Sequence, residues 1–185
     1  MLETYHLSMQ DLEAGMEDIR QSPKENGLVK MIVRRPNVDE RELVDEAELT
    51  LDRGLVGDNW KPRGSSSTPD GSANIQAQVT VTNARAIALM AQDETRWPLA
   101  GDQFYVDFDL SDDNIPPGTR IQIGSAVLEV SEKPHTGCNK FSARFGLEAL
   151  KFVNSPEGKH FHLRGINTKV IQAGTIHVGD SVKKL

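Results

Sequence analysis

The chain has little of what secreted and membrane proteins depend on. Its 185 residues include one cysteine, so no internal disulfide is possible and a reducing compartment is expected. The most apolar stretch, residues 86–91, is far shorter than the ~20 residues that a membrane span requires. Residues 1–10 lack the basic start and long apolar run of a secretory signal. We therefore expect a cytoplasmic protein with no membrane partner.

Positive charge is also in short supply. The chain has 21 Lys and Arg residues against 27 Asp and Glu residues, a net charge of -6. A nucleic-acid partner is not expected, because a protein that neutralises phosphates needs a basic footprint. The phosphate-loop, dinucleotide-binding, nucleophile-elbow and His-Glu-x-x-His motifs are absent as well.

The charge is distributed unevenly along the chain. Residues 1–132 hold 12 basic and 24 acidic side chains, whereas residues 133–185 hold 9 basic and 3 acidic ones. The second segment also contains the cysteine and four of the five histidines. This asymmetry sets residues 133–185 apart from the rest of the chain and is a feature that the function should explain.

The spacing of apolar residues predicts a β-rich α+β protein. Helices are expected at 9–21, 83–92 and from about Ser142, where Phe141, Phe145, Ala149 and Phe152 share one helical face. Strands are expected at 28–34, 47–51, 78–82, 103–108, 119–123, 126–130, 165–171 and 175–182. This pattern favours a single barrel-like domain at 28–185, preceded by a helical extension at 1–27. The Gly/Ser/Pro-rich residues 61–74 are interpreted as a linker or as a lid over a site.

Cys138 is the first candidate for chemistry. A lone cysteine is often a buried, inert thiol. Here Pro134 and Gly137 predict a loop, and Lys140 and Arg144 are close in sequence. Nearby cations and a following helix N-terminus stabilise the thiolate, which is the nucleophilic and metal-binding form.

Histidines supply further candidates. His135 could hydrogen-bond the Cys138 sulfur or relay a proton. On a strand, His160 and His162 would share a face, and with His135 and Cys138 they could form a zinc site. Their irregular spacing is not typical of zinc sites, however. Arg164 is interpreted either as a bidentate anchor for a phosphate or pterin or as a solvated surface arginine.

Several motifs, taken in order, resemble the MOSC domain, named for the C-terminal domain of molybdenum cofactor sulfurase. They are Gly54-Leu55-Val56-Gly57-Asp58, Gln78-Val79-Thr80-Val81-Thr82, Ala100-Gly101-Asp102, His135-Thr136-Gly137-Cys138, Arg164-Gly165-Ile166-Asn167 and Gly174-Thr175-Ile176-His177-Val178-Gly179-Asp180. The resemblance runs from about residue 28 to 185 and implies a β-barrel with peripheral helices. The chain is expected to be a stand-alone MOSC protein. It has no room for the desulfurase domain of the sulfurases, so pyridoxal phosphate is not an expected cofactor.

The resemblance implies that Cys138 ligates molybdenum in a molybdopterin cofactor. It implies cofactor-binding roles for Asp58, Lys140, Arg144, Arg164 and Asn167, with Cys138 and His135 as catalytic residues. The expected reaction is reduction of an N-hydroxylated or similar small substrate, with electrons from a separate reductase. A second hypothesis makes the chain a sulfur carrier that holds a persulfide on Cys138, supplied by a desulfurase partner. A third makes it a non-catalytic binding module. The first hypothesis requires Lys140, Arg144 and Arg164 to converge near Cys138.

Overall fold

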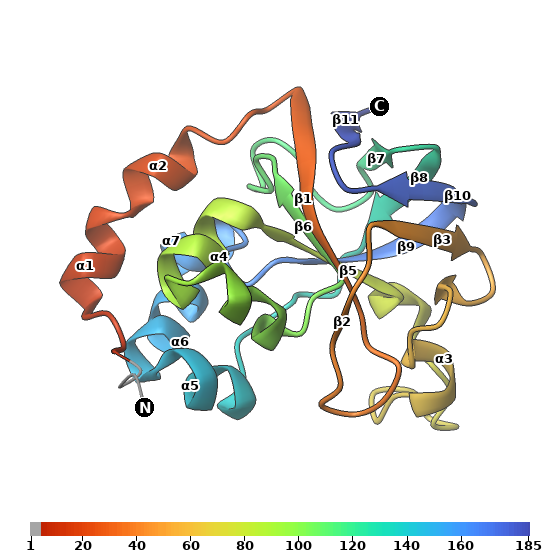
Figure 1. The fold of residues 1–185 in the computed structure, drawn as a ribbon, viewed down its shortest axis with the longest axis horizontal. Coiled ribbons are helices and arrows are strands. Elements are labelled where there is room, and N and C mark those ends of the chain that lie inside the picture. The colour runs from red at the N-terminus through yellow and green to blue at the C-terminus, as the bar shows by residue number, and fades with distance from the viewer. Residues whose placement is uncertain (1–4) are drawn as a thin grey trace.

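Seven strands close into a barrel in the computed structural model, which describes residues 5–185 (Figure 1). In their order around the barrel they are β1 (Asn26–Arg34), β11 (Ser181–Lys184), β7 (Arg120–Ile123), β8 (Ala126–Val130), β9 (Ile166–Gln172), β5 (Val79–Asn83) and β6 (Phe104–Asp107). Every neighbouring pair is antiparallel except β5 and β6. Pairing of β1 with β11 completes the ring, which leaves no free barrel edge.

A smaller sheet lies beside one end of the barrel. Its strands are β10 (Gly174–His177), β3 (Glu46–Thr50) and β4 (Gly54–Leu55), all antiparallel. The two-residue strand β2 (Glu42–Leu43) pairs with the end of β1. After β4 come the short helix α3 (Trp60–Arg63) and the 3-10 helix η1 (Ile75–Ala77). The loop that the sequence predicts at 61–74 is therefore helical at residues 61–63, and the loop itself runs over residues 64–74.

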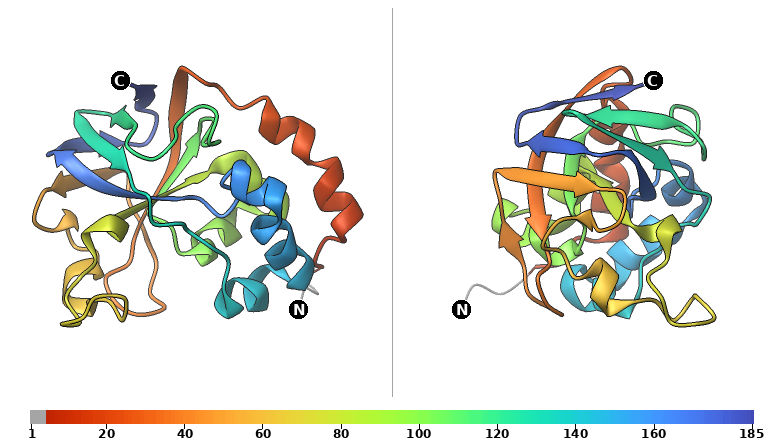
Figure 2. Two further views of the ribbon diagram at one scale, coloured as in Figure 1. Left: turned by 180° about the vertical axis from the view of Figure 1, so that it is seen from behind. Right: turned by 90° about the vertical axis from the view of Figure 1, so that its right-hand side faces the viewer.

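The other helices gather on one side of the barrel (Figures 1 and 2). They are α1 (Met9–Ala14), α2 (Met16–Arg20), α4 (Ala84–Ala91), the 3-10 helix η2 (Glu94–Ala100), α5 (Asn139–Phe145), α6 (Leu147–Asn154) and α7 (Pro156–His160). Asn83 fixes the start of α4, because its side chain accepts hydrogen bonds from the backbone amides of Arg85 and Ala86. None of the described helices combines the length and the apolar character that a membrane span needs.

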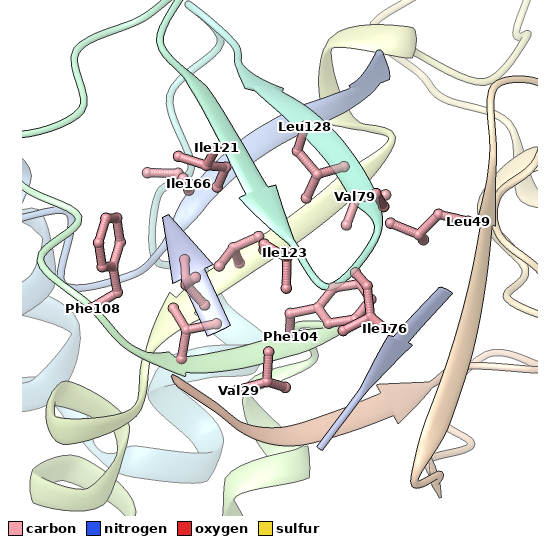
Figure 3. Close-up of a cluster of buried hydrophobic side chains, with 14 of the residues drawn as sticks. Val29, Leu49, Val79, Phe104, Phe108, Ile121, Ile123, Leu128, Ile166 and Ile176 are labelled. Atoms are coloured by element: carbon pink, nitrogen blue, oxygen red, sulfur yellow. The ribbon is translucent and has the colours of Figure 1, made fainter. Parts of the chain in front are cut away.

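Apolar side chains form two buried clusters. One fills the barrel and its junction with the smaller sheet; Figure 3 shows Phe104 and Ile123 within it, beside Leu49 and Ile176 of the smaller sheet. The other lies between the barrel and the helices and includes Met16 and Phe145. A barrel strand that is covered by helices is buried on both faces, which is why all five residues of β5 are buried.

The predicted β-barrel with peripheral helices is confirmed, with local corrections. The helix predicted at 9–21 is interrupted at Gly15, where an added Cβ would lie 2.5 Å from the Leu89 side chain. The strand predicted at 175–182 is two strands, because a turn with Gly179 at φ 91° sends β10 to the smaller sheet and β11 to the barrel. The division into 1–27 and 28–185 stays a prediction. Within it, α1 and α2 fall in the first part, β1 begins at Asn26, and residues 1–4 lie outside the described chain.

Candidate functional site

A cavity of about 230 Å³ is lined by Cys138 together with a cluster of cations. The cations come from distant parts of the chain: Arg35 follows β1, Arg63 belongs to α3 and Arg164 precedes β9. The complete set of basic side chains in the lining is Arg35, Arg41, Arg63, Lys140, Arg144 and Arg164. Asp39 is the one acidic residue among the described residues of this lining.

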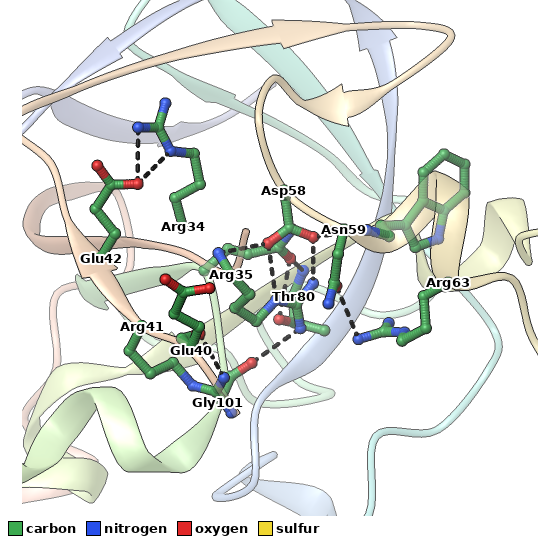
Figure 4. A network of polar contacts seen from close by, with 12 residues as sticks. Arg34, Arg35, Glu40, Arg41, Glu42, Asp58, Asn59, Arg63, Thr80 and Gly101 are labelled. Carbon is green, nitrogen blue, oxygen red and sulfur yellow. Dashed lines mark hydrogen bonds and ion pairs between the residues drawn. The ribbon is translucent and has the colours of Figure 1, made fainter. Parts of the chain in front are cut away.

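The first wall of the cavity is held by Asp58 (Figure 4). Its carboxylate accepts from Arg35 Nε and Nη2, both at 2.8 Å, and from the backbone amides of Arg35 and Trp60, both at 3.0 Å. Arg35 Nη1 also donates to the Gly101 carbonyl at 2.9 Å. The Asp58 side chain is fully buried, so this bidentate pair fixes the Arg35 guanidinium in one position.

The second wall is held by Asp102, which joins two side chains. Arg164 Nη1 donates to Asp102 Oδ2 at 2.6 Å, and His135 Nε2 lies 2.8 Å from Asp102 Oδ1. Because a carboxylate only accepts, we assign the proton of His135 to Nε2. Arg164 Nη2 donates to the Ala100 carbonyl, and its guanidinium lies 5.0 Å from the centre of the Phe141 ring.

Burial and neighbouring charges have opposing effects on the pKa values of Asp102 and His135. Burial alone raises the pKa of Asp102, but the charges of Arg164 and His135, with their hydrogen bonds, lower it to about 2. Burial and the Arg164 charge lower the pKa of His135, and Asp102 only partly opposes them. At neutral pH the wall therefore contains an ionised Asp102, a charged Arg164 and a neutral His135.

The mouth of the cavity is more exposed. Lys140 Nζ and Arg144 Nη2 lie 3.3 and 3.1 Å from the same oxygen, Oδ1 of Asp39. The side chains of Asp39 and Lys140 are 59% and 65% exposed. The hydrogen bond from Lys140 holds the pKa of Asp39 below its usual value.

Two cations of the lining have no carboxylate partner among residues 5–185. Arg41 donates to the carbonyls of Pro98 and Glu40, and Arg63 donates to the Asn59 side chain at 3.3 Å. Burial, followed by the charges of Arg144 and Arg35, lowers the pKa of Arg41, and burial followed by Arg35 lowers that of Arg63. Six cations against the carboxylates of Asp39, Asp58 and Asp102 leave a surplus of three positive charges.

Cys138 is exposed at the edge of the cavity, as the N-cap residue of α5. Its side chain makes no capping hydrogen bond, so the sulfur is available to a ligand. The helix begins at Asn139, not near Ser142 as the sequence predicts, and Gly146, at φ 97°, separates it from α6. Phe141 and Phe145 are buried beneath it, as their spacing predicts.

The structure brings together four of the residues singled out from the sequence, since Cys138, Lys140, Arg144 and Arg164 all line this cavity. Asp58 lies behind the wall, bonded to Arg35. Asn167 donates to the carbonyls of Lys133 and Pro134 and lines a neighbouring cavity.

His135 also departs from the expected arrangement. Its ring bonds Asp102 and lines two neighbouring cavities, so the predicted hydrogen bond to Cys138 is not formed in the described chain.

His160 and His162 do not lie on a strand, the arrangement in which they would share a face. Ser155 caps a helix that has Pro156 at its first position, so His160 ends α7, and His162 lies in the following turn at φ 48°. His160 faces Asp113, and His162 Nδ1 lies 2.6 Å from the Leu110 carbonyl. Across residues 5–185, no three His, Cys, Asp or Glu side chains are grouped to hold a metal ion.

Sequence reasoning missed half of the cations and the carboxylate that anchors Arg164. Arg35, Arg41 and Arg63 belong to the acidic segment 1–132 and follow no periodic pattern. Asp102 stood within the Ala100-Gly101-Asp102 motif without a role. One available signal was that an aspartate beside a glycine turn, once buried, needs a cationic partner.

Comparison with known proteins supports the fold and the family. The model of the MOSC domain family matches residues 68–183, more than half of the chain. Solved structures with the same fold include the YuaD protein from Bacillus subtilis, with a TM-score of 0.63 and 14% identity over 86% of this chain and 95% of that one. YiiM from Escherichia coli has a TM-score of 0.55 and 17% identity over 85% of this chain and 69% of that one. No curated protein matches the sequence.

Proposed function

The chain belongs to the MOSC domain family, and on that premise we propose that it binds a molybdenum cofactor of the molybdopterin type in the cavity beside Cys138. The thiolate of Cys138 is the metal ligand, and sulfur is a soft donor suited to this metal. The observation that carries the proposal is that the exposed thiol and six cations line one cavity.

The residues present fit such a group. Molybdopterin carries a phosphate, and the surplus of three positive charges favours an anion of that kind. Arg164 Nε is buried and has no hydrogen-bond partner within the described residues, so one donor of the wall remains unused. Arg35 and Arg164 are fixed by buried carboxylates, so these two guanidinium groups need not reorganise when an anion binds.

Within this function the chain's residues bind and orient. Arg63, Arg41 and Lys140 hold the anionic part, and Phe141 supports the Arg164 guanidinium from below. When bound, the cofactor supplies two-electron redox chemistry, which we propose serves the reduction of an N-hydroxylated or similar small substrate with electrons from a separate reductase. His135 acts through Asp102 and Arg164 as a positioning residue.

A second candidate function follows from the exposure of the Cys138 sulfur. As a sulfur carrier, its thiolate attacks the outer sulfur of a persulfide on a desulfurase. A new sulfur–sulfur bond forms on Cys138, and the donor's own thiolate leaves. This function needs the thiol and an accessible mouth, but it does not need the six cations.

The deciding experiment is expression in a host that makes molybdenum cofactor, followed by measurement of molybdenum and pterin in purified wild type and in Cys138→Ala. The proposal predicts both in the wild type and a loss of both in the variant. A mass gain of one sulfur on Cys138, dependent on a desulfurase and without metal, supports the carrier instead. If neither metal with pterin nor added sulfur is found, and the Cys138 thiol resists alkylation in the native protein, both functions are contradicted.

A matched pair of variants tests the role of the cations. Arg63 and Lys61 both lie in α3, but only Arg63 lines the cavity, while Lys61 pairs with Asp52 on the surface. We expect Arg63→Gln to lower the pterin content several-fold, with Lys61→Gln unchanged. An equal loss in both variants would mean that overall charge, not this cavity, retains the pterin.

A further inference from the structure

The cations of the cavity differ in how firmly carboxylates hold them. The pairs of Arg35 with Asp58 and of Arg164 with Asp102 have carboxylate side chains with no exposed surface. Asp39, by contrast, stands at the exposed mouth and is shared by Lys140 and Arg144. Exposed ion pairs contribute little free energy, because water and salt screen them. The Asp39 contacts are therefore the ones that an incoming anion can replace.

The backbone at Asp39 points to the same conclusion. Its φ of 61° is a left-handed conformation that few side chains adopt, although aspartate tolerates it better than most. The residue lies between Arg35 and Arg41, which both line the cavity, and its own side chain faces the cations. The surrounding turn is closed by the Glu40 amide, which donates to the Asn37 carbonyl at 3.2 Å, so the Asp39 carboxylate can give up its side-chain contacts while this backbone hydrogen bond stays in place.

Both cations would remain available to an anion without Asp39. Arg144 Nη1 donates to the Leu99 carbonyl at 2.7 Å, which fixes the guanidinium independently. Lys140 contacts no other carboxylate within residues 5–185, so its ammonium group is free to follow a new anion. Together they can donate to two oxygens of one tetrahedral oxyanion.

We propose that Lys140 and Arg144 form an oxyanion subsite for a phosphate group, and that Asp39 is an internal competitor that sets its affinity. A phosphate that binds there takes the hydrogen bonds that Asp39 Oδ1 now accepts, and the carboxylate turns to solvent. The proposal rests on the proposed function, because it treats the mouth as part of the same binding site. It adds that a residue of the chain itself weakens that site.

The test is calorimetric titration with inorganic phosphate at low, fixed ionic strength. Asp39→Asn removes the competing charge but keeps the side-chain shape. We expect it to bind phosphate about fivefold more tightly than the wild type. This factor corresponds to the small free energy of the two weak ion pairs that phosphate has to replace in the wild type. Asp52→Asn is the matched control, because it removes the same charge from another exposed Asp–Lys pair, with Lys61, away from the cavity. It should bind phosphate as the wild type does.

A double-mutant cycle places the effect at the subsite. In Lys140→Gln, phosphate binding should weaken, and adding Asp39→Asn should recover less than fivefold, because Lys140 is one of the two cations for which both anions compete. Equal affinities of wild type and Asp39→Asn, or equal gains in Asp39→Asn and Asp52→Asn, would overturn the proposal. So would the absence of phosphate binding in every variant.

The result is distinguishable from that of the proposed function. Phosphate titration uses the purified chain alone, whereas the proposed function is judged by molybdenum and pterin content. If Asp39→Asn tightens phosphate binding while the wild type retains no pterin, the subsite stands and the cofactor assignment fails. If pterin is retained and Asp39→Asn has no effect on phosphate, the cofactor assignment stands and the competitor role fails.

Discussion

The inner wall and the mouth of the cavity use the same residue types in opposite ways. In the wall, Asp58 and Asp102 are buried, and each holds one arginine with short hydrogen bonds. At the mouth, Asp39 is exposed and divides one oxygen between two cations. An aspartate can therefore build a binding site or obstruct it, and burial decides which.

The energetic reason is that removing one partner of a buried pair leaves a charge in a medium that cannot solvate it. The same removal at the surface leaves a charge that water solvates at once. The wall should accordingly govern the stability of the fold, and the mouth should govern the affinity for anions.

The largest effect should come from Asp102→Asn. The substitution leaves the Arg164 guanidinium buried without its counter-charge and weakens the bond to His135. We expect the free energy of unfolding to fall by about 3 kcal/mol, as for other broken buried pairs. Urea denaturation at neutral pH measures it. A loss below about 1 kcal/mol, typical of exposed pairs, would remove the distinction between wall and mouth.

Acid should act on the wall in two steps. The pKa of His135 is lowered in the fold from its usual 6.5, so the unfolded chain takes the proton first and stability falls as pH drops below 6.5. The pKa of Asp102 is lowered from 3.8 to about 2, so a further loss follows between these values. His135→Gln should abolish the first step in urea denaturation at stepped pH. A first step that persists in this variant would assign it to another group.

The smallest effect should come from Asp39→Asn. Because Asp39 and Lys140 are exposed, and Arg144 keeps its hydrogen bond to the Leu99 carbonyl, we expect no measurable change in the urea midpoint, alongside the tighter phosphate binding predicted above. Asp52→Asn should match it in stability but not in phosphate affinity. A clear destabilisation by Asp39→Asn alone would show that the ion pairs at the mouth contribute to the stability of the fold.

The sequence predicted the strands of the barrel well, because alternation and turn residues are local signals. The hairpin of β7 and β8 around Gly124 and the cap at Asn83 were found in this way. The errors had tertiary and local causes. The helix predicted at 9–21 is interrupted at Gly15, where the Leu89 side chain of α4 packs closely, whereas His160 ends a helix that the local Ser155-Pro156 signal starts.

The candidate site was only half visible in the sequence. The basic segment 133–185 supplied Lys140, Arg144 and Arg164, and the structure places them together at the cavity. The other three cations come from the acidic segment, whose net charge concealed them. Net charge along a chain averages over residues that the fold later separates, and a cavity collects side chains by topology.

The closure of the barrel has a consequence for how the protein forms. The ring is completed where residues 26–28 of β1 meet residues 181–183 of β11, almost the whole described chain apart. During synthesis from the N-terminus, β1 can pair with β6 long before its other neighbour, β11, has been made, and the smaller sheet also lacks β10 until residues 174–177 emerge. The binding cavity, which takes Arg35 from just beyond β1 and Arg164 from just before β9, forms only as the last strands emerge. Contacts this distant in sequence are expected to make folding slow and to leave β1 exposed to the wrong partners until β11 arrives.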